Sequence, residues 1–271
     1  MHALTDYRGY LETAVEAARA AETVIRHYYQ GTFDVERKAD ASPVTVADIE
    51  SERAIKDVLS RAYPEHGFYG EELGHESADA EYVWLIDPVD GTKSFVRGYP
   101  FFSTQIALRH RGELVVGVSN APMFNGGELA CAARGHGATL NGEPIRVSTT
   151  DALAETSLSL GNIAALGASP AWPDIGALVG RVHRIRGYGD FYHYHLLASG
   201  RIDAILESDL NILDIAALTV ILREAGGDIS ALGGGAIDLD TRSVFATNGR
   251  LREAIAPFVS AWDEARDAPT G

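Results

Sequence analysis

The chain has 271 residues, 46% hydrophobic and 23% charged, a composition typical of a folded globular protein rather than a disordered one. Its 38 acidic and 23 basic residues give a formal net charge of −15, which argues against binding to nucleic acid or to an anionic membrane surface. A single cysteine excludes a disulfide framework, and the sequence shows neither a long apolar stretch nor a secretory leader pattern, so we expect a cytoplasmic protein.

Two helices are predicted at the start of the chain. Apolar residues at three- and four-residue steps favour an amphipathic helix over residues 4–29. After a short strand at 33–38, Thr45 stands three residues before Asp48, a spacing typical of the capping box that opens a helix. We expect this second helix to run to about residue 62.

Short strands separated by turn signals come next. An Asn-Gly pair at 141–142 is the dipeptide expected at a tight hairpin turn. The segments predict a mostly antiparallel sheet beside the two helices. They cover residues 67–72, 82–87, 102–109, 113–121, 127–134 and 143–148.

Beyond about residue 150 the pattern changes to strands that alternate with helices, which predicts helices packed on the faces of a second sheet. The expected strands are 156–162, 183–189, 201–208 and 243–248, and the expected helices are 174–182, 190–199, 213–227 and 249–265. We therefore expect an N-terminal α+β half, residues 1–150, and a C-terminal α/β half, residues 151–271. The two halves should pack intimately as one compact unit.

The segment "YVWLIDPVDGTKSF" ends an apolar strand in an acidic turn, at the kind of sheet edge where α/β proteins place their sites. Pro88 should fix the turn, and a helix that starts after it would present backbone N–H groups to a phosphate. Asp-Gly is also an ordinary turn dipeptide, so a turn that binds no ligand remains the alternative. In chain order the segment offers a carboxylate, a carbonyl, a second carboxylate and two amides: Asp87, Val89, Asp90, Gly91 and Thr92.

Two other acidic positions indicate a metal site only when they are considered together with this turn. Glu71, in "YGEELG", is read alone as part of a solvated acidic loop, and Asp214, in "LDIAALTVILREAGG", as a helix cap. If Asp87 and Asp90 converge with them, the four carboxylates repel one another unless cations bind. Oxygen ligands without cysteine or paired histidines suit Mg²⁺ or Mn²⁺, and metals beside helix-start amides suit phosphoryl transfer to water.

At these residues the sequence resembles the inositol monophosphatase family of Mg²⁺-dependent phosphatases. The motif "WLIDPVDGTKSFVRGYPFFSTQIAL" carries the resemblance, with "GEELG" before it and "LDIAALTVILREAGG" after it. The resemblance implies an αβαβα five-layer sandwich of the inositol monophosphatase/fructose-1,6-bisphosphatase type, two or three Mg²⁺ ions per site with Mn²⁺ as a possible substitute, and a homodimer.

The resemblance also implies roles for single residues. The metal ligands would be Glu71, Asp87, the Val89 carbonyl, Asp90 and Asp214. Glu71 and Thr92 would orient and activate the attacking water, with Asp48 hydrogen-bonded behind Thr92. The amides of Gly91 and Thr92 would hold the phosphate, to which Lys93 could contribute. Many relatives carry Trp before the distal Asp, and Leu213 at that place should alter packing rather than ligation.

The segment "GYGDFYHYH" bears on the substrate, because its Gly-Asp-Phe pattern resembles the histidinol-phosphate phosphatase branch of the family. Asp190 and Glu207 would then pair the ammonium group of L-histidinol phosphate. The alternative is that Asp190 only caps the helix 190–199. His193 and His195 stand two apart on that helix and are expected to be core or surface residues, not a zinc pair.

Three rival functions remain open. They are a myo-inositol-1-phosphate phosphatase, a nucleotide or sugar bisphosphatase, and a non-catalytic metal- or anion-binding regulatory protein. A bisphosphatase needs a second basic pocket, which this acidic chain does not obviously supply.

Overall fold

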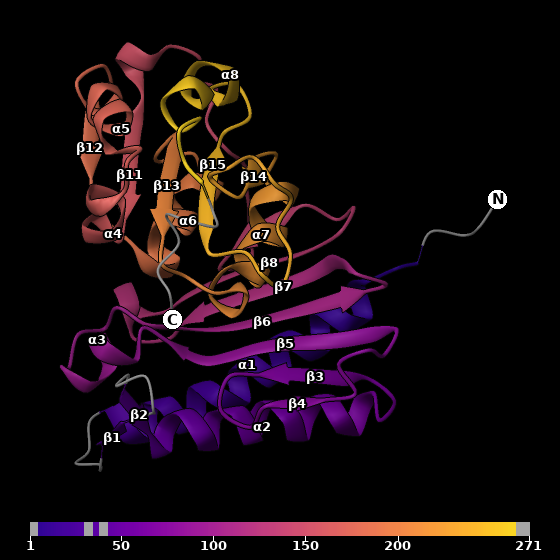
Figure 1. The fold of residues 1–271 in the computed structure, drawn as a ribbon. Helices are drawn as coiled ribbons and strands as arrows, with labels where there is room; N and C mark the ends of the chain where they lie inside the picture. Colours follow the sequence, from indigo (N-terminus) through magenta and orange to yellow (C-terminus); the bar gives the residue numbers. More distant parts are fainter. Residues whose placement is uncertain (1–4, 30–34, 38–42, 264–271) are drawn as a thin grey trace. The chain divides into compact units, whose positions relative to one another are not determined.

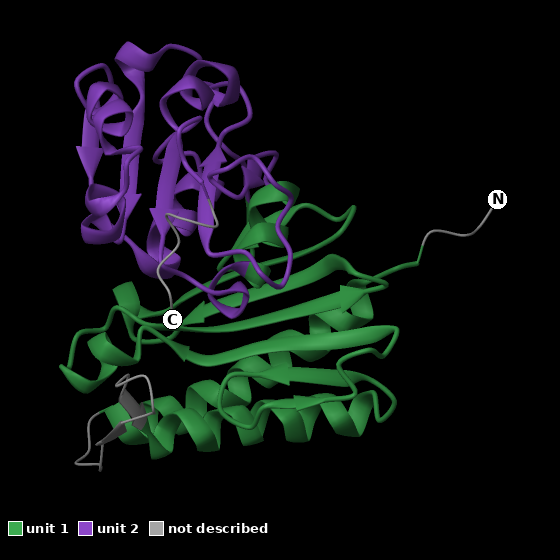
Figure 2. Ribbon diagram, in the orientation of Figure 1, with its two compact units in different colours: residues 1–144, 216–224 green, residues 145–215, 225–271 purple. Residues whose placement is uncertain are grey.

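The computed structural model describes residues 5–29, 35–37 and 43–263, and the chain divides into two compact units (Figure 2). Unit 1 contains residues 1–144 and 216–224, and unit 2 contains residues 145–215 and 225–271. The first division lies close to the change of pattern at residue 150. Residues 216–224 belong to unit 1 although they follow most of unit 2 in the sequence, and this was not predicted. The helix that contains them is apolar on nearly all sides, so its pattern does not indicate which sheet it packs on.

Unit 1 contains one large sheet and the helices that pack on it (Figure 1). Its sheet is mostly antiparallel, as expected, with the order β10-β9-β8-β7-β6-β5-β3-β4 and one parallel pair, β3 with β5. The elements of this part of the chain are α1 (Arg8–Tyr29), β1 (Val35–Arg37), β2 (Pro43–Thr45), α2 (Val46–Ala62), β3 (Gly67–Gly70), β4 (His75–Glu76), β5 (Tyr82–Asp90), α3 (Thr92–Val96), β6 (Ser103–His110), β7 (Glu113–Ala121), the 3₁₀ turn η1 (Phe124–Gly126), β8 (Glu128–Ala133), β9 (Ala138–Leu140) and β10 (Glu143–Ile145).

Helices α1 and α2 cover one face of this sheet. Alternate strand residues such as Trp84 and Ile106 point into a core shared with Ala18 of α1 and Ile55 of α2. On the opposite face, α7 (Ile212–Glu224) comes so close to β7 that a Cβ at Gly117 would overlap the backbone of Ala217. The sheet of unit 1 therefore has helices on both faces.

Unit 2 contains a five-stranded mixed sheet with the order β12-β11-β13-β15-β14. Strand β11 pairs in parallel with β12 and β13, whereas β15 pairs antiparallel with β13 and β14. The elements are the 3₁₀ turn η2 (Leu153–Glu155), β11 (Ser157–Gly161), α4 (Ile163–Ala168), α5 (Trp172–Val179), β12 (Arg184–Arg186), α6 (Asp190–Ala198), β13 (Ala204–Ser208), β14 (Asp228–Ser230), β15 (Ser243–Thr247), α8 (Arg252–Ile255) and the 3₁₀ turn η3 (Ala256–Phe258).

The helices of unit 2 also lie on both faces of its sheet. Leu158 and Leu206 share a core with residues of α4, α5 and α8. Ser159 and Glu207, on the other face, contact α6 through His193. Because β11 is parallel to both β12 and β13, the carboxyl ends of these three strands lie at the same edge of the sheet. This is the edge at which α/β folds place their sites.

The strands expected at 143–148 and 183–189 are shorter in the structure, as β10 and β12, and two further expectations about local structure were wrong. The strand expected at 82–87 continues as β5 to Asp90, because a β-bulge absorbs the residues that were read as a turn. The helix expected at 249–265 is confined to α8 and a 3₁₀ turn, 252–258, where Pro257 has no N–H to continue an α-helix. Residues 264–265 of that expected helix, residue 4 of the first helix and residues 33, 34 and 38 of the strand expected at 33–38 lie outside the described residues, whereas 35–37 form β1 as expected.

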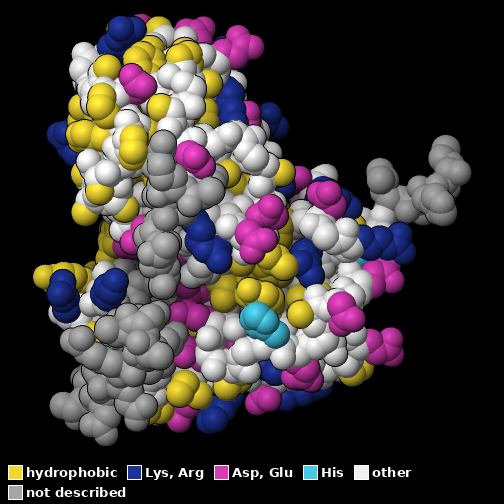
Figure 3. All heavy atoms as spheres, in the orientation of Figure 1, with side chains coloured by type: hydrophobic (Ala, Val, Ile, Leu, Met, Phe, Trp, Pro, Cys, Tyr) yellow, Lys and Arg dark blue, Asp and Glu magenta, His cyan; other side chains and the backbone are white. Residues whose placement is uncertain are grey.

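On the face shown in Figure 3, Lys and Arg side chains lie among acidic ones rather than in a single basic patch. None of the described helices combines the length and apolarity that a membrane span requires.

Candidate metal centre and substrate site

The acidic end of β5 is built as a bulge rather than as a free turn. Asp87 pairs with Gln105 and Asp90 with Ser103, so three steps along β5 match two along β6. Pro88, which cannot donate a ladder hydrogen bond, lies inside this bulge, where proline is tolerated. Asp87 and Asp90 are 2% and 9% exposed, and Asp87 Oδ1 accepts a hydrogen bond from the Val89 amide at 3.0 Å.

A short helix begins directly after the bulge. Gly91, its N-cap, has φ 93°, and a Cβ there would lie 2.9 Å from the carbonyl oxygen of Phe101. Glycine is therefore required both by conformation and by space. The N–H groups of Gly91 and Thr92 lie at the start of α3, where backbone donors lack intrahelical acceptors. Lys93, in the same turn, is exposed.

Asp48 lies behind Thr92, as the resemblance implied. The Thr92 hydroxyl is 3.2 Å from Asp48 Oδ1 and 3.0 Å from the Val89 carbonyl oxygen. Asp48 Oδ2 accepts hydrogen bonds from the Thr45 amide and hydroxyl, and this confirms the expected capping box. Burial raises the pKa of Asp48, hydrogen bonds from Thr45 and Thr92 oppose that rise, and the charge of Glu71 adds to it.

Glu52 is a residue that sequence reasoning missed. It is fully buried on α2, and its carboxylate accepts hydrogen bonds from the amides of Glu72 at 2.7 Å and Leu73 at 3.2 Å. It therefore holds the loop that carries Glu71. Burial raises the pKa of Glu52, and the charge of Glu71 contributes to the rise against these two hydrogen bonds. The available signal was its position four residues after Asp48, on the same face of the helix.

Asp214 lies in the first turn of α7, the helix whose residues 216–224 pack on the sheet of unit 1. Its carboxylate accepts hydrogen bonds from the amide and the side chain of Asn211, at 2.7 and 3.1 Å, so it does contribute to the helix cap. It also meets the bulge, because Asp87, Asp90 and Asp214 each place a carboxylate oxygen within 4.8 Å of the other two.

These three carboxylates fit a divalent cation that prefers oxygen ligands. Asp87 and Asp90 are buried, Asp214 is partly buried, and neither cysteine nor histidine belongs to the group. Like charges held so close in a partly desolvated place favour a bound cation. Glu71 is not a member of this group, and its charge acts instead on Asp48 and Glu52. Its role as a ligand stays a prediction, as does that of the Val89 carbonyl.

The two residues expected to select the substrate lie in unit 2. Asp190 is the first residue of α6, with φ 45°, and the N-cap is Gly189, which makes no side-chain capping bond. Whether the Asp190 side chain caps this helix or contacts the substrate stays a prediction. Glu207, at the carboxyl end of β13, is 6% exposed. Its Oε2 lies 2.7 Å from the Tyr194 hydroxyl and 3.1 Å from His193 Nε2.

Both histidines of α6 are buried, at 0% and 1% exposure for His193 and His195, which agrees with the core interpretation. Neither belongs to a group of potential metal ligands among the described residues. Sequence reasoning did not connect His193 with Glu207, because the two residues stand fourteen positions apart on different elements.

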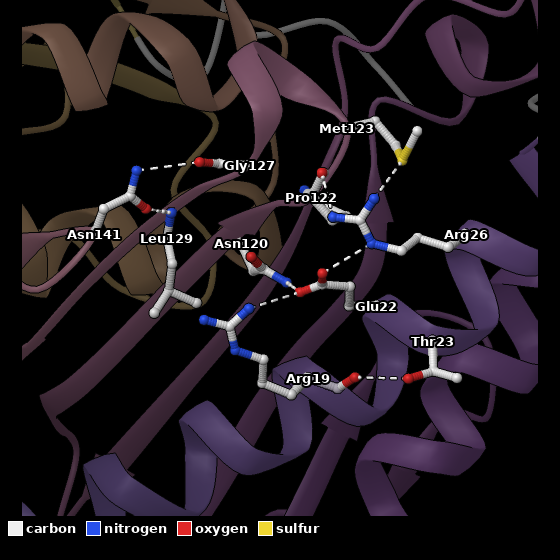
Figure 4. Close-up of polar contacts among 10 residues, drawn as sticks. All are labelled: Arg19, Glu22, Thr23, Arg26, Asn120, Pro122, Met123, Gly127, Leu129 and Asn141. Carbon is white, nitrogen blue, oxygen red and sulfur yellow. Dashed lines mark hydrogen bonds and ion pairs between the residues drawn. The ribbon is translucent and has the colours of Figure 1, made fainter.

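A hollow of about 520 Å³ lies in unit 1, between α1 and the turn after β7. It is lined by two arginines, but Glu22 stands between them, 3.1 Å from Arg19 and 2.9 Å from Arg26 (Figure 4). Asn120 donates a further hydrogen bond to Glu22 at 3.2 Å. Burial alone would raise the pKa of Glu22, yet the hydrogen bonds from Arg26 and Asn120 leave it below the usual value.

Known proteins resemble this chain over most of its length. The chain is 35% identical over 256 residues to a histidinol-phosphatase of Mycobacterium tuberculosis, covering 93% of this chain and 98% of that protein. It is 38% identical over 220 residues to the bifunctional phosphatase IMPL2, chloroplastic, of Arabidopsis thaliana, of which it spans only 61%, with 79% of this chain covered. The solved inositol monophosphatase from Anabaena (Nostoc) sp. PCC 7120 superposes with a TM-score of 0.81 at 31% identity, covering 95% of this chain and 100% of that one.

The likeness to this solved structure confirms the layered α/β fold class. The sequence model described as the inositol monophosphatase family matches residues 6–263, nearly the whole chain. This protein therefore belongs to the inositol monophosphatase family and is a phosphatase, a phosphoric monoester hydrolase.

Proposed function

We propose that this phosphatase is Mg²⁺-dependent and that its preferred substrate is L-histidinol phosphate, which it hydrolyses to L-histidinol and phosphate. The observation that carries the reaction is the group of three carboxylates, Asp87, Asp90 and Asp214, next to the helix-start amides of Gly91 and Thr92. The carboxylates suit Mg²⁺, with Mn²⁺ as a possible substitute, and the amides suit a phosphate.

Bound Mg²⁺ would lower the pKa of water and neutralise charge on the phosphoryl oxygens and on the leaving alkoxide. Thr92 donates its hydroxyl hydrogen to Asp48 or to the Val89 carbonyl, which leaves its oxygen free to accept a hydrogen bond from the attacking water. Glu71 would accept the proton of that water as its oxygen bonds to phosphorus and the ester P–O bond breaks, and a proton from solvent water would convert the leaving alkoxide to the alcohol. The amides of Gly91 and Thr92, with the Lys93 ammonium, would hold the phosphate.

Two carboxylates support a cationic alcohol as the leaving group. Asp190 comes four residues after the carboxyl end of β12, and Glu207 lies near the carboxyl end of β13; both strands pair in parallel with β11, which lies between them. An ammonium group would pair with them through charge-assisted hydrogen bonds, whereas an uncharged polyol would gain less. The likeness to the histidinol-phosphatase of Mycobacterium tuberculosis supports the same substrate.

The second candidate is myo-inositol 1-phosphate, which the likeness to the Anabaena inositol monophosphatase favours. A nucleotide or sugar bisphosphatase needs a second anion pocket. The hollow beside Arg19 and Arg26 does not suit that need, because Glu22 already pairs with both guanidinium groups. A non-catalytic binder would not need the Thr92–Asp48 contact behind the helix start. The homodimer and the cytoplasmic location remain predictions.

The test is kcat/KM for L-histidinol phosphate beside that for myo-inositol 1-phosphate, with and without Mg²⁺. We expect the histidinol ester to be preferred and Asp90→Asn to lower kcat by at least about 100-fold for both esters, because a ligand charge is lost at the reacting phosphate. Asp190→Asn should reduce the preference, because it removes the charge of this side chain. Asparagine is chosen because it tolerates the positive φ of this position.

Turnover that persists without divalent metal would contradict the mechanism. A preference for inositol 1-phosphate, or a preference that Asp190→Asn does not change, would contradict the substrate assignment. Inactivity on both esters would favour the non-catalytic binder.

A further inference from the structure

Glu207 belongs to a buried hydrogen-bonded chain in unit 2 whose other members have no role in the proposed reaction. Ser159, His193 and Tyr194 are 0%, 0% and 2% exposed, and they lie on β11 and α6. The Tyr188 amide donates to Ser159 Oγ at 3.3 Å, and Ser159 Oγ lies 3.2 Å from His193 Nδ1. The chain ends where His193 Nε2 and the Tyr194 hydroxyl meet Glu207 Oε2.

The direction of these hydrogen bonds follows from the chemistry of the groups. A carboxylate only accepts, so His193 Nε2 must carry the hydrogen in its contact with Glu207. With its lone pairs available to the Tyr188 amide, Ser159 can donate its own hydrogen to Nδ1. Whichever group donates between Ser159 Oγ and Nδ1, both ring nitrogens of His193 have a partner, and the Nε2–H is directed at Glu207.

Both donors converge on the same oxygen of Glu207. Oε2 receives two hydrogen bonds, whereas Oε1 receives none from the described residues. Oε1 lies against Gly161, at the carboxyl end of β11, where a Cβ would overlap the carboxylate. Oε1 does not belong to the buried polar atoms that lack a partner, and the Glu207 side chain is 8% exposed, so Oε1 is the oxygen that a ligand can reach.

We propose that Ser159, His193 and Tyr194 are positioning residues that hold the Glu207 carboxylate with Oε1 as the acceptor for the cationic group of the substrate. This inference rests on the proposed function, since it specifies how an ammonium ester is preferred over an uncharged one. Gly161 contributes the space that Oε1 occupies. When a donor to Oε2 is removed, the carboxylate is less firmly oriented, and the preference for the cation falls.

The experiment compares His193→Phe, which keeps an aromatic ring without a donor, with His193→Gln, whose amide N–H₂ reaches about as far as Nε2. Tyr194→Phe removes the other donor with almost no change in volume, and stays informative if the histidine variants do not fold. KM and kcat are measured for L-histidinol phosphate and for myo-inositol 1-phosphate at saturating Mg²⁺. His183→Gln, at an exposed histidine outside this chain of hydrogen bonds, is the control.

We expect His193→Phe and Tyr194→Phe to raise KM for the histidinol ester about tenfold more than KM for the inositol ester, the size expected for a weakened charged hydrogen bond. His193→Gln should recover most of the loss. Calorimetric titration with L-histidinol alone should show the same order of affinities without turnover. Equal losses for both esters, or no loss in any variant, would overturn the inference. Failure of the proposed substrate is read separately, in the wild type, as a preference for the inositol ester.

Discussion

Single buried acids decide how the catalytic loop is held. Asp48 and Glu52 stand one turn apart on α2, both buried, and each supports a neighbouring segment: Asp48 contacts Thr92, and Glu52 binds the loop after Glu71. The Thr45–Asp48 capping box was predictable because its partners are three residues apart. The role of Glu52 was not predictable, because its partners lie twenty residues away in a loop without a periodic pattern.

Glu52→Gln tests this role. A glutamine offers one acceptor oxygen, so one of the amides of Glu72 and Leu73 would face a donor instead. We expect the free energy of unfolding to fall by about 1–3 kcal/mol and activation by Mg²⁺ to require about tenfold more metal. Chemical denaturation and a Mg²⁺ titration of activity measure the two effects. Asp57→Asn, at an exposed position of the same helix, is the control; equal behaviour of the two variants would contradict the assignment.

At the scale of elements, most of the secondary structure was predictable. The hairpin at Asn141-Gly142 is confirmed, since both residues adopt the positive φ that such a turn requires. Two features were not predictable. The bulge in β5 depends on its partner strand, because DPVDG alone reads as a turn. The position of α7 depends on the absence of a side chain at Gly117, and sequence periodicity does not report such long-range fits.

Gly117→Ala should therefore act on the metal centre from a distance. The added methyl group meets the α7 backbone at Ala217 and must displace the helix that carries Asp214. We expect a loss of about 1–3 kcal/mol in stability from overpacking, together with weaker Mg²⁺ activation. Gly176→Ala, in α5, is the control: its Cβ meets nothing within 4 Å, and alanine is the better helix former. A Gly117→Ala protein with unchanged stability and an unchanged Mg²⁺ response would show that the contact between Gly117 and Ala217 does not position Asp214.

At the scale of the whole molecule, stability depends on how an acidic chain distributes its carboxylates. A formal charge of −15 implies net self-repulsion at neutral pH. Buried Asp48 and Glu52 have raised pKa values, so their ionisation opposes folding as the pH rises. Glu22 has a lowered pKa and acts in the other direction. It joins Arg19 and Arg26 of α1 to Asn120 near the end of β7 (Figure 4).

Glu22→Gln should consequently flatten the acid side of the stability curve. The folded-state pKa of Glu22 lies below its unfolded value of 4.5, so its stabilising contribution is complete above that pH and is lost as the pH falls through the folded value. We expect the variant to lose about 1 kcal/mol at pH 7, from two helix ion pairs and one hydrogen bond, and to converge on the wild type as the pH falls below the folded-state pKa of Glu22. Tm measured from pH 7 to pH 3 tests this, with Glu16→Gln, at an exposed carboxylate of the same helix, as the control. Parallel curves for Glu22→Gln and the wild type would mean that the charge of Glu22 contributes nothing to folding. Any constant difference in Tm between the two proteins would then come from packing around the hollow.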